Sequence, residues 1–207
     1  MYYNSYELYH HGIKGQKWGV RRFQNADGSL TKAGELRYET KSARKEYSKA
    51  FDRAYTSQFG NLGITKAGRE RRAEDFNNLN KATNKYLNTK AQYKIEKKRE
   101  KGASEEKLAK MQERADYDAK KRAGRERIAK AANDAYANES TARHLVTTFF
   151  AGAGSKSTIA ALEASGMSHK GAVATSLLLG HYGSESIAMY RSDKQVRNEY
   201  REKKNNS

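Results

Sequence analysis

The chain has 207 residues, a formal net charge of +17 at pH 7 and only 36% hydrophobic residues. Many of the apolar residues are alanines, which bury little area, so the composition excludes a thick globular core and favours long helices packed along narrow seams. The lack of cysteine excludes disulfides and thiolate metal sites, and the lack of proline fits long uninterrupted helices.

The first zone, residues 1–30, is rich in tyrosine, glycine and basic residues. Its four glycines argue against a long helix, and the run from Asn25 to Gly28 is typical of a turn. Residues 1–8 contain no apolar stretch of the kind found in secretory signals. We therefore expect a flexible Gly/aromatic docking tag over 1–30.

The second zone, residues 31–58, has the pattern of one long helix. Thr31 is a suitable N-cap, and alanines and aromatic residues then recur at helical spacing to give one aromatic-alanine face. Phe59 and the glycines at 60 and 63 predict its end.

The third zone predicts two more long helices, over 65–101 and 105–138. Gly102 is typical of a helix stop and Ser104 of an N-cap. Helices of nearly equal length joined by a short turn predict an antiparallel hairpin split near 102–104. Because the apolar stripe is thin, an extended rod that needs a partner is an equal alternative.

The fourth zone, residues 139–207, loses charge and gains small residues up to about residue 184. We expect two or three short helices with close contacts, followed by a charged amphipathic tail helix from about 186 to 204. The predicted fold is therefore all-α, with an N-terminal tag, long charged helices over 31–138 and a small helical C-terminal region.

A short sequence occurs twice. Leu30-Thr31-Lys32-Ala33-Gly34 is similar to Ile64-Thr65-Lys66-Ala67-Gly68, and each copy follows a glycine-containing turn. Both copies are typical of a capped helix start. Either a module has been duplicated, or two helix starts have converged on the same cap chemistry.

The most specific motif lies within the tag and contains the only tryptophan of the chain. Glycines would let the backbone fold tightly, so that Ile13, Trp18 and Phe23 can form a small apolar knot fringed by lysines and arginines. The motif reads His10-His11-Gly12-Ile13-Lys14-Gly15-Gln16-Lys17-Trp18-Gly19-Val20-Arg21-Arg22-Phe23-Gln24-Asn25-Ala26-Asp27-Gly28-Ser29-Leu30-Thr31.

This stretch resembles a short N-terminal element of tailed-phage and prophage proteins. The similarity covers residues 10–34, with mild departures at Gln16, Phe23 and Ala26, where the family often has Met, Tyr and Pro. In that family the element heads otherwise unrelated proteins, many of them structural or head-associated. The resemblance implies a portable docking tag rather than a catalytic site. Its candidate docking residues are His10, His11, Gly12, Ile13, Lys14, Gly15, Lys17, Trp18, Gly19, Arg21, Arg22 and Phe23.

From the resemblance we expect a minor structural or head cargo protein of a phage virion, located in the particle or in the host cytoplasm before assembly. Its partners would be capsid, portal or head proteins, in an oligomer or larger assembly. A cytoplasmic regulatory or host-takeover protein is the alternative, and a membrane-active ejection protein is a weaker one.

Basic clusters in the long helices are candidates for non-specific DNA contact, because cations along a helix edge can neutralise phosphates. Glutamates intervene in both clusters, so a merely solvated helix surface is the competing interpretation. The candidate residues are Lys94, Lys97, Lys98, Arg99, Lys101, Lys120, Lys121, Arg122, Arg125 and Arg127.

No pattern of residues favours catalysis, and we expect a protein that is not an enzyme and needs no cofactor. His10 and His11 are adjacent and lack further ligands at suitable spacing, which argues against a metal site. The run from Gly152 to Ser157 lacks the spacing of a phosphate loop, so its glycines fit a helix junction better.

A membrane-spanning helix is not expected. The uncharged stretches 144–155 and 171–184 hold 12 and 14 residues, whereas a spanning helix needs about 20. Peripheral or transient insertion remains an alternative for this small-residue zone.

Overall fold

The computed structural model describes residues 23–25, 27–60 and 64–206. These residues form six α-helices and no named strand, which confirms the predicted all-α class. Helices α1 (Lys32–Gly60), α2 (Lys66–Arg99) and α3 (Glu105–Ala137) are long, whereas α4 (Thr141–Phe149) and α5 (Lys156–Ala164) are short. A sixth helix, α6 (His169–Asn205), is long but kinked.

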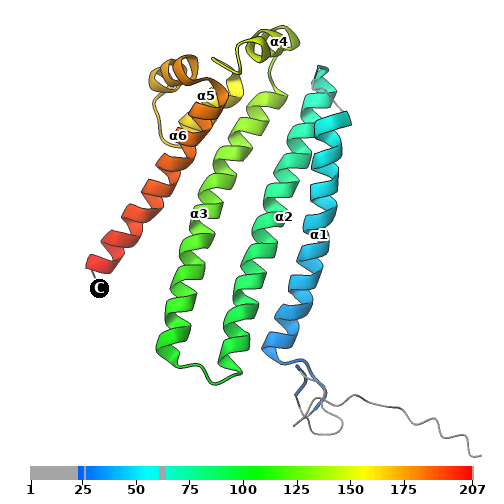
Figure 1. Cartoon of the computed structure of the whole chain (residues 1–207), viewed down its shortest axis with the longest axis vertical. Coiled ribbons are helices and arrows are strands. Elements are labelled where there is room, and N and C mark those ends of the chain that lie inside the picture. Colours follow the sequence, from blue (N-terminus) through cyan, green and yellow to red (C-terminus); the bar gives the residue numbers. More distant parts are fainter. Residues whose placement is uncertain (1–22, 26, 61–63, 207) are drawn as a thin grey trace, which may run out of the picture.

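The long helices lie side by side in the order α1, α2, α3 and α6 (Figure 1), and neighbouring helices in this order pack on each other. Helices α2 and α3 form the predicted antiparallel hairpin. The turn between them contains Gly102, whose φ of 73° favours glycine. Ser104 stands at the N-cap position of α3, although its side chain accepts no cap hydrogen bond.

The seams between the long helices are thin, as the composition predicts. Nine of the fifteen buried hydrophobic side chains in the described part of the chain are alanines, so most seams let two backbones approach closely but bury little area. The larger buried side chains in the α2–α3 hairpin are Ile95, Leu108 and Ile128. The apolar stripe is thus only partly buried, since Phe76 and Leu79 of α2 are of intermediate exposure.

The short helices form a separate layer at one end of the long ones. Residues 139–182, called the head below, comprise α4, α5 and the first half of α6, and they lie at the end opposite Gly102 (Figure 1). Helix α5 packs on both α3 and α6, around buried residues that include Ile159, Ala161 and Leu162.

The tail helix begins earlier than the sequence predicts. We expected a separate helix from about residue 186, but α6 runs from His169 to Asn205 and is only kinked at Gly180, where φ is 61° and ψ is −159°. Within α6 only Gly180 leaves helical geometry. The chain is helical again at Gly183, so the two parts form one kinked helix.

Small residues bring α6 close to its neighbours. Its buried positions recur every four residues on both sides of the kink, as Ala172, Ser176, Ser184, Ala188, Ser192 and Val196. On α3, a Cβ atom added to Gly124 would overlap the Ser192 hydroxyl, so this crossing depends on glycine. Among the described residues, no helix is long and apolar enough to cross a membrane.

Candidate interaction surfaces

The described end of the phage-like motif, residues 23–25 and 27–31, folds back on itself ahead of α1. Gln24 and Leu30 form an antiparallel bridge, and the Thr31 amide donates to the Phe23 carbonyl oxygen at 2.9 Å. Gly28 at the tip has a φ of 83°. Asp27 accepts from the Ser29 amide at 2.9 Å, and the hydrogen bonds from Ser29 lower the pKa of the Asp27 carboxyl. The predicted turn is therefore confirmed.

This turn is packed onto the helices through Phe23. The Phe23 ring lies 4.9 Å from the Arg37 guanidinium carbon of α1 and 6.5 Å, centroid to centroid, from the Tyr93 ring of α2. In the first turn of α1, a Cβ atom added to Gly34 would lie 2.6 Å from the Phe23 carbonyl oxygen. Gly34 is therefore required for the turn to rest on the first turn of α1.

The repeated sequence forms the same cap twice. The Thr31 hydroxyl accepts from the Gly34 amide at 3.1 Å, and the Thr65 hydroxyl accepts from the Gly68 amide at 3.1 Å. The copies then differ in their surroundings. Arg69, which follows the second copy, is 1% exposed and donates to the Glu139 carbonyl oxygen at 2.6 Å. Shared cap chemistry is confirmed, whereas the origin of the repeat by duplication stays a prediction.

The other eleven predicted docking residues, from His10 to Arg22, lie outside the described residues, and so do Met1 to Tyr9. The expected flexibility of the tag and the apolar knot around Trp18 therefore stay predictions. Phe23 is the one docking candidate whose surroundings the structure describes.

The basic candidates on α3 diverge instead of forming one edge. Arg125 makes two hydrogen bonds to Asp193 of α6, at 3.1 and 2.5 Å, and Lys121 pairs with the same carboxylate at 3.0 Å. Arg122 turns to the other side and donates to Asn88 of α2 at 2.7 Å. These cations hold the helices together, whereas Arg127 is exposed.

The Asp193 carboxylate is electrostatically perturbed by these contacts. Its burial opposes ionisation, but the hydrogen bonds from Arg125 and Lys121 outweigh this and lower the pKa of Asp193. The Asp193 side chain is only 14% exposed. Asp193 therefore joins α6 to α3 through an ionic contact with Arg125 and Lys121 that is partly shielded from solvent.

The basic candidates at the end of α2 remain more accessible. Lys94, Lys98, Arg99 and Lys101 are exposed beside the α2–α3 turn, while Lys97 lies over the Tyr93 ring, 5.8 Å from its centroid. Arg99 pairs with Glu96. Because Tyr93 also contacts Phe23, this cluster adjoins the described end of the motif.

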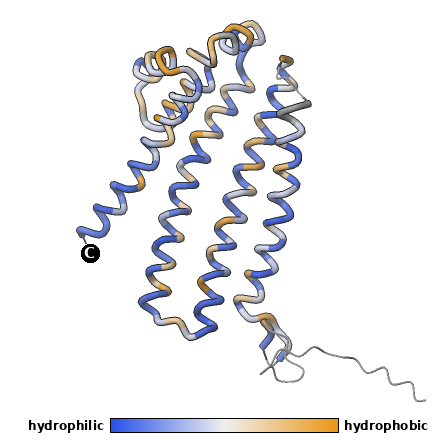
Figure 2. Tube along the Cα trace, viewed as in Figure 1, coloured by the Kyte–Doolittle hydropathy of each residue, from blue (hydrophilic) through white to orange (hydrophobic). Residues whose placement is uncertain are grey.

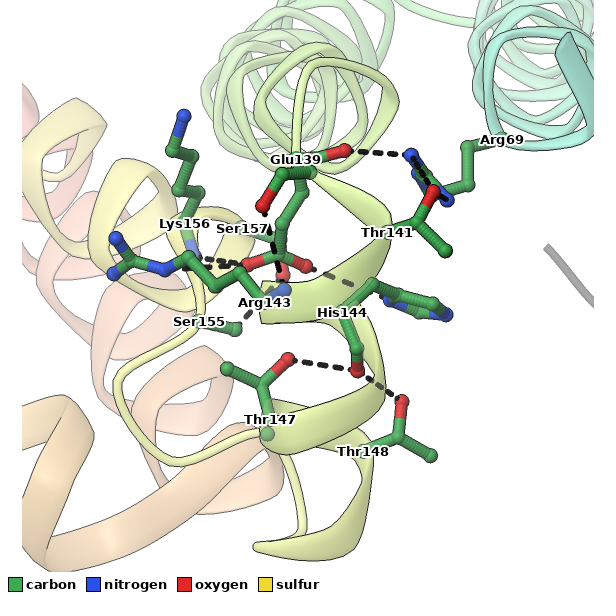
Figure 3. A network of polar contacts seen from close by, with 12 residues as sticks. Arg69, Glu139, Thr141, Arg143, His144, Thr147, Thr148, Ser155, Lys156 and Ser157 are labelled. Atoms are coloured by element: carbon green, nitrogen blue, oxygen red, sulfur yellow. Dashed lines mark hydrogen bonds and ion pairs between the residues drawn. The ribbon is translucent and has the colours of Figure 1, made fainter. Parts of the chain in front are cut away.

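A buried glutamate organises the head. The Glu139 side chain is 1% exposed, and its carboxylate accepts from the Lys156 amide at the N-terminus of α5 at 3.1 Å (Figure 3). It also lies 3.7 Å from Arg143 Nε and 3.5 Å from His144 Nδ1. The backbone oxygen of Glu139 also accepts a hydrogen bond from the Arg69 guanidinium of α2. Glu139 thus ties the α3–α4 connection to both α2 and α5, a role that the sequence did not reveal.

A groove of about 640 Å³ lies between α2, α3, α6 and the head. On one wall the Arg72 guanidinium lies 5.7 Å from the Tyr136 ring centroid, and the Tyr136 ring meets His144 edge-on at 5.2 Å. On the other wall His181 pairs with Glu185 at 3.4 Å. The described residues contain no group of three or more His, Asp or Glu able to hold a metal ion.

The glycine-rich run that follows α4 is a helix junction, as its spacing predicts. Gly152 and Gly154 have φ values of 77° and 68°, and Ser155 then caps α5. A Cβ atom on Gly152 would lie 2.8 Å from the His181 Cβ atom. The glycines thus permit a close approach of this junction to α6.

Comparison with known proteins adds no relative to these observations. No protein-family profile matches the chain, and neither do any curated protein sequence or solved structure.

Proposed function

We propose that the protein is a minor structural or head cargo protein of a tailed-phage virion, which docks onto capsid, portal or head proteins through residues 10–34. The proposal rests on the similarity of that segment to the phage element. The remainder of the chain would act as a helical scaffold without catalytic chemistry.

One structural observation supports different roles, docking and anchoring, for the two parts of the element. The identities of Asp27, Gly28 and Thr31 are explained by the turn and by the cap of α1, and Gly34 is explained by the contact with Phe23. Residues 10–22, with Trp18, lie outside the described residues and are the part of the element that remains for docking. We assign docking to this preceding part and anchoring to 23–34.

Mass spectrometry of purified particles tests the proposal. We expect the wild-type protein in virions and a large loss of incorporation for Trp18→Ala. Gly34→Ala should weaken incorporation as well, because its Cβ displaces the anchored turn, whereas the exposed Glu39→Ala on the same helix should have no effect. Presence in infected cells with absence from virions would refute the proposal and favour the cytoplasmic regulatory alternative.

Non-specific DNA contact is a second proposal, and it is favoured only for the end of α2. Lys94, Lys98 and Lys101 are exposed there and form no ion pair with the described residues, whereas Lys121 and Arg125 are engaged with Asp193. Replacing these three lysines with glutamine should weaken DNA binding and lower its salt dependence. Equal binding by Lys121→Gln and the triple variant would contradict this assignment.

A further inference from the structure

One side of α1 is exposed along most of its length and carries cations followed by aromatic rings. Its positions recur every three or four residues, so they form a single stripe about 27 Å long. None of its six residues is acidic, and all are exposed. From the N-terminal end of α1 they are Arg37, Lys41, Arg44, Ser48, Phe51 and Tyr55. The Phe51 and Tyr55 rings are 47% and 57% exposed, so the stripe ends in an aromatic surface open to solvent.

The exposed rings of this stripe continue across the seam onto α2. The Phe51 ring stacks on Tyr55 at 6.3 Å and contacts Tyr47 at 6.1 Å, centroid to centroid. Tyr47 stacks in turn on Tyr86 of α2 at 5.9 Å, and Lys90 lies 5.3 Å from the centroid of the Tyr86 ring. These contacts join the four rings into one contiguous surface, called the aromatic track below.

The other end of the stripe reaches the basic end of α2. The Arg37 guanidinium carbon lies 4.9 Å from the centroid of the Phe23 ring, which contacts Tyr93 of α2, and Lys97 lies over the Tyr93 ring. The exposed lysines at 94, 98 and 101 follow on the same helix end and turn. Cations therefore extend from the aromatic track along α1 to the α2–α3 turn.

Helices α1 and α2 carry most of the net charge of the chain. Together they contain 18 lysines and arginines against eight acidic residues, a net charge of +10 out of +17, whereas α3 contains nine against seven. Hydrophilic positions predominate along both helices (Figure 2). Three of the four acidic residues of α1 lie on the flank opposite the stripe, where Glu46 pairs with Lys85 at 2.7 Å, and only Asp52 lies beside it.

Exposed stacked rings next to a line of cations suit a single-stranded nucleic acid. Unpaired bases stack on aromatic side chains while lysines and arginines contact the phosphates. A duplex can use only the cations, because its bases are already stacked inside the helix. A second copy of the chain would bring two faces of the same sign together, at +10 each.

We propose that the α1–α2 face binds single-stranded nucleic acid, with bases on the aromatic track and phosphates along Arg37, Lys41 and Arg44. This inference deepens the DNA contact proposed for the end of α2 and rests on that second proposal for the continuation of the basic surface. It does not depend on the docking role proposed for residues 10–34.

Fluorescence anisotropy of the full-length protein tests it with two probes, an oligothymidine of about 20 nucleotides and a duplex of the same length. The ring variant is Phe51→Ala with Tyr55→Ala, and its matched control is Tyr182→Ala with Tyr190→Ala, two exposed rings of α6. The cation variant is Lys41→Gln with Arg44→Gln. Its control, Lys45→Gln with Lys49→Gln, removes the same charge from exposed positions of α1 outside the stripe.

We expect wild-type protein to bind the oligothymidine more tightly than the duplex, although cations alone would favour the duplex for its higher charge density. The ring variant should bind the oligothymidine at least about tenfold more weakly and the duplex like wild type. The cation variant should bind the oligothymidine more weakly than its control. Circular dichroism of the ring variant should match wild type, because both side chains are exposed.

The proposal is overturned if wild-type protein binds the duplex as tightly as the oligothymidine, or if the ring variant and the α6 control bind the oligothymidine equally. It is also overturned if the ring variant dissociates an oligomer that wild type forms without nucleic acid, since the track would then be a contact between copies. Replacing the three lysines at 94, 98 and 101 tests the second proposal separately, because that variant should lose affinity for both probes.

Discussion

At the scale of single residues, the contact between α3 and α6 depends on the absence of a side chain at Gly124. Glycine inside a helix ordinarily costs about 1 kcal/mol relative to alanine. Here the Ser192 hydroxyl occupies the space of a side chain, and Ser192 is itself 1% exposed. Close approach of the two helices therefore outweighs the helix propensity lost at this position.

Gly124→Val should lower the free energy of unfolding by about 1–3 kcal/mol, because an added branched side chain overpacks the crossing. Ala123→Val is the matched control, since Ala123 is the exposed neighbour and only helix propensity changes there, by about 0.5 kcal/mol. Urea unfolding measures both. An equal effect of the two variants would show that the α3–α6 crossing tolerates bulk.

The Asp193 pair makes the same contact dependent on pH. The pKa of Asp193 lies below its ordinary value of 3.8 in the folded chain, so the ionised form favours folding above that value, and the stabilisation is lost as pH falls through the folded pKa. Asp193→Asn should therefore be less stable than wild type at neutral pH, with a difference that shrinks as the pH falls below 3.8. Urea midpoints across this range test the sign. A difference that grows on acidification would refute it.

At the scale of elements, the sequence predicts those helix ends that are determined by local chemistry. Thr31 and Thr65 are recognisable caps because each hydroxyl bonds an amide three residues later, and Gly102 marks a turn through its positive φ. The kink at Gly180 could not be placed, because a glycine in a sequence does not reveal whether it interrupts a helix, as Gly180 does, or remains inside one, as Gly183 does.

The α3–α4–α5 junction depends on Glu139, and its removal should destabilise the head. Glu139→Ala leaves the Lys156 amide without its acceptor in a buried site, so we expect a loss of about 1–3 kcal/mol. Glu139→Gln keeps an acceptor and should lose less. The exposed Glu163→Ala should change stability by less than about 0.5 kcal/mol. Thermal unfolding ranks the three variants, and a Glu163 variant as unstable as the Glu139→Ala variant would contradict this role.

At the scale of the whole molecule, composition predicts the class of fold but not the order of the helices. The α2–α3 hairpin follows from two equal segments and a short turn, because its contacts are local in sequence. The placement of α6 beside α3 depends on Gly124 and Ser192, small residues that carry no information about their partner. The exposure of Leu178 and Val146 could not be predicted either, because large aliphatic side chains are usually buried.

The order of the helices also predicts how stability is distributed. Helix α1 lies at the edge of the layer and, among the described helices, packs extensively on α2 alone, through the fully buried Ala33, Ala43 and Ala54. These alanines bury little area, so α1 is held weakly. Helix α3, in contrast, contacts α2, α5 and α6 and buries the larger side chains Leu108 and Ile128. Amide hydrogen exchange should therefore be faster in α1 than in α3, because an edge helix can open without disrupting the rest. Protection of α1 equal to that of α3, rising with protein concentration, would instead mean that self-association covers this edge in solution.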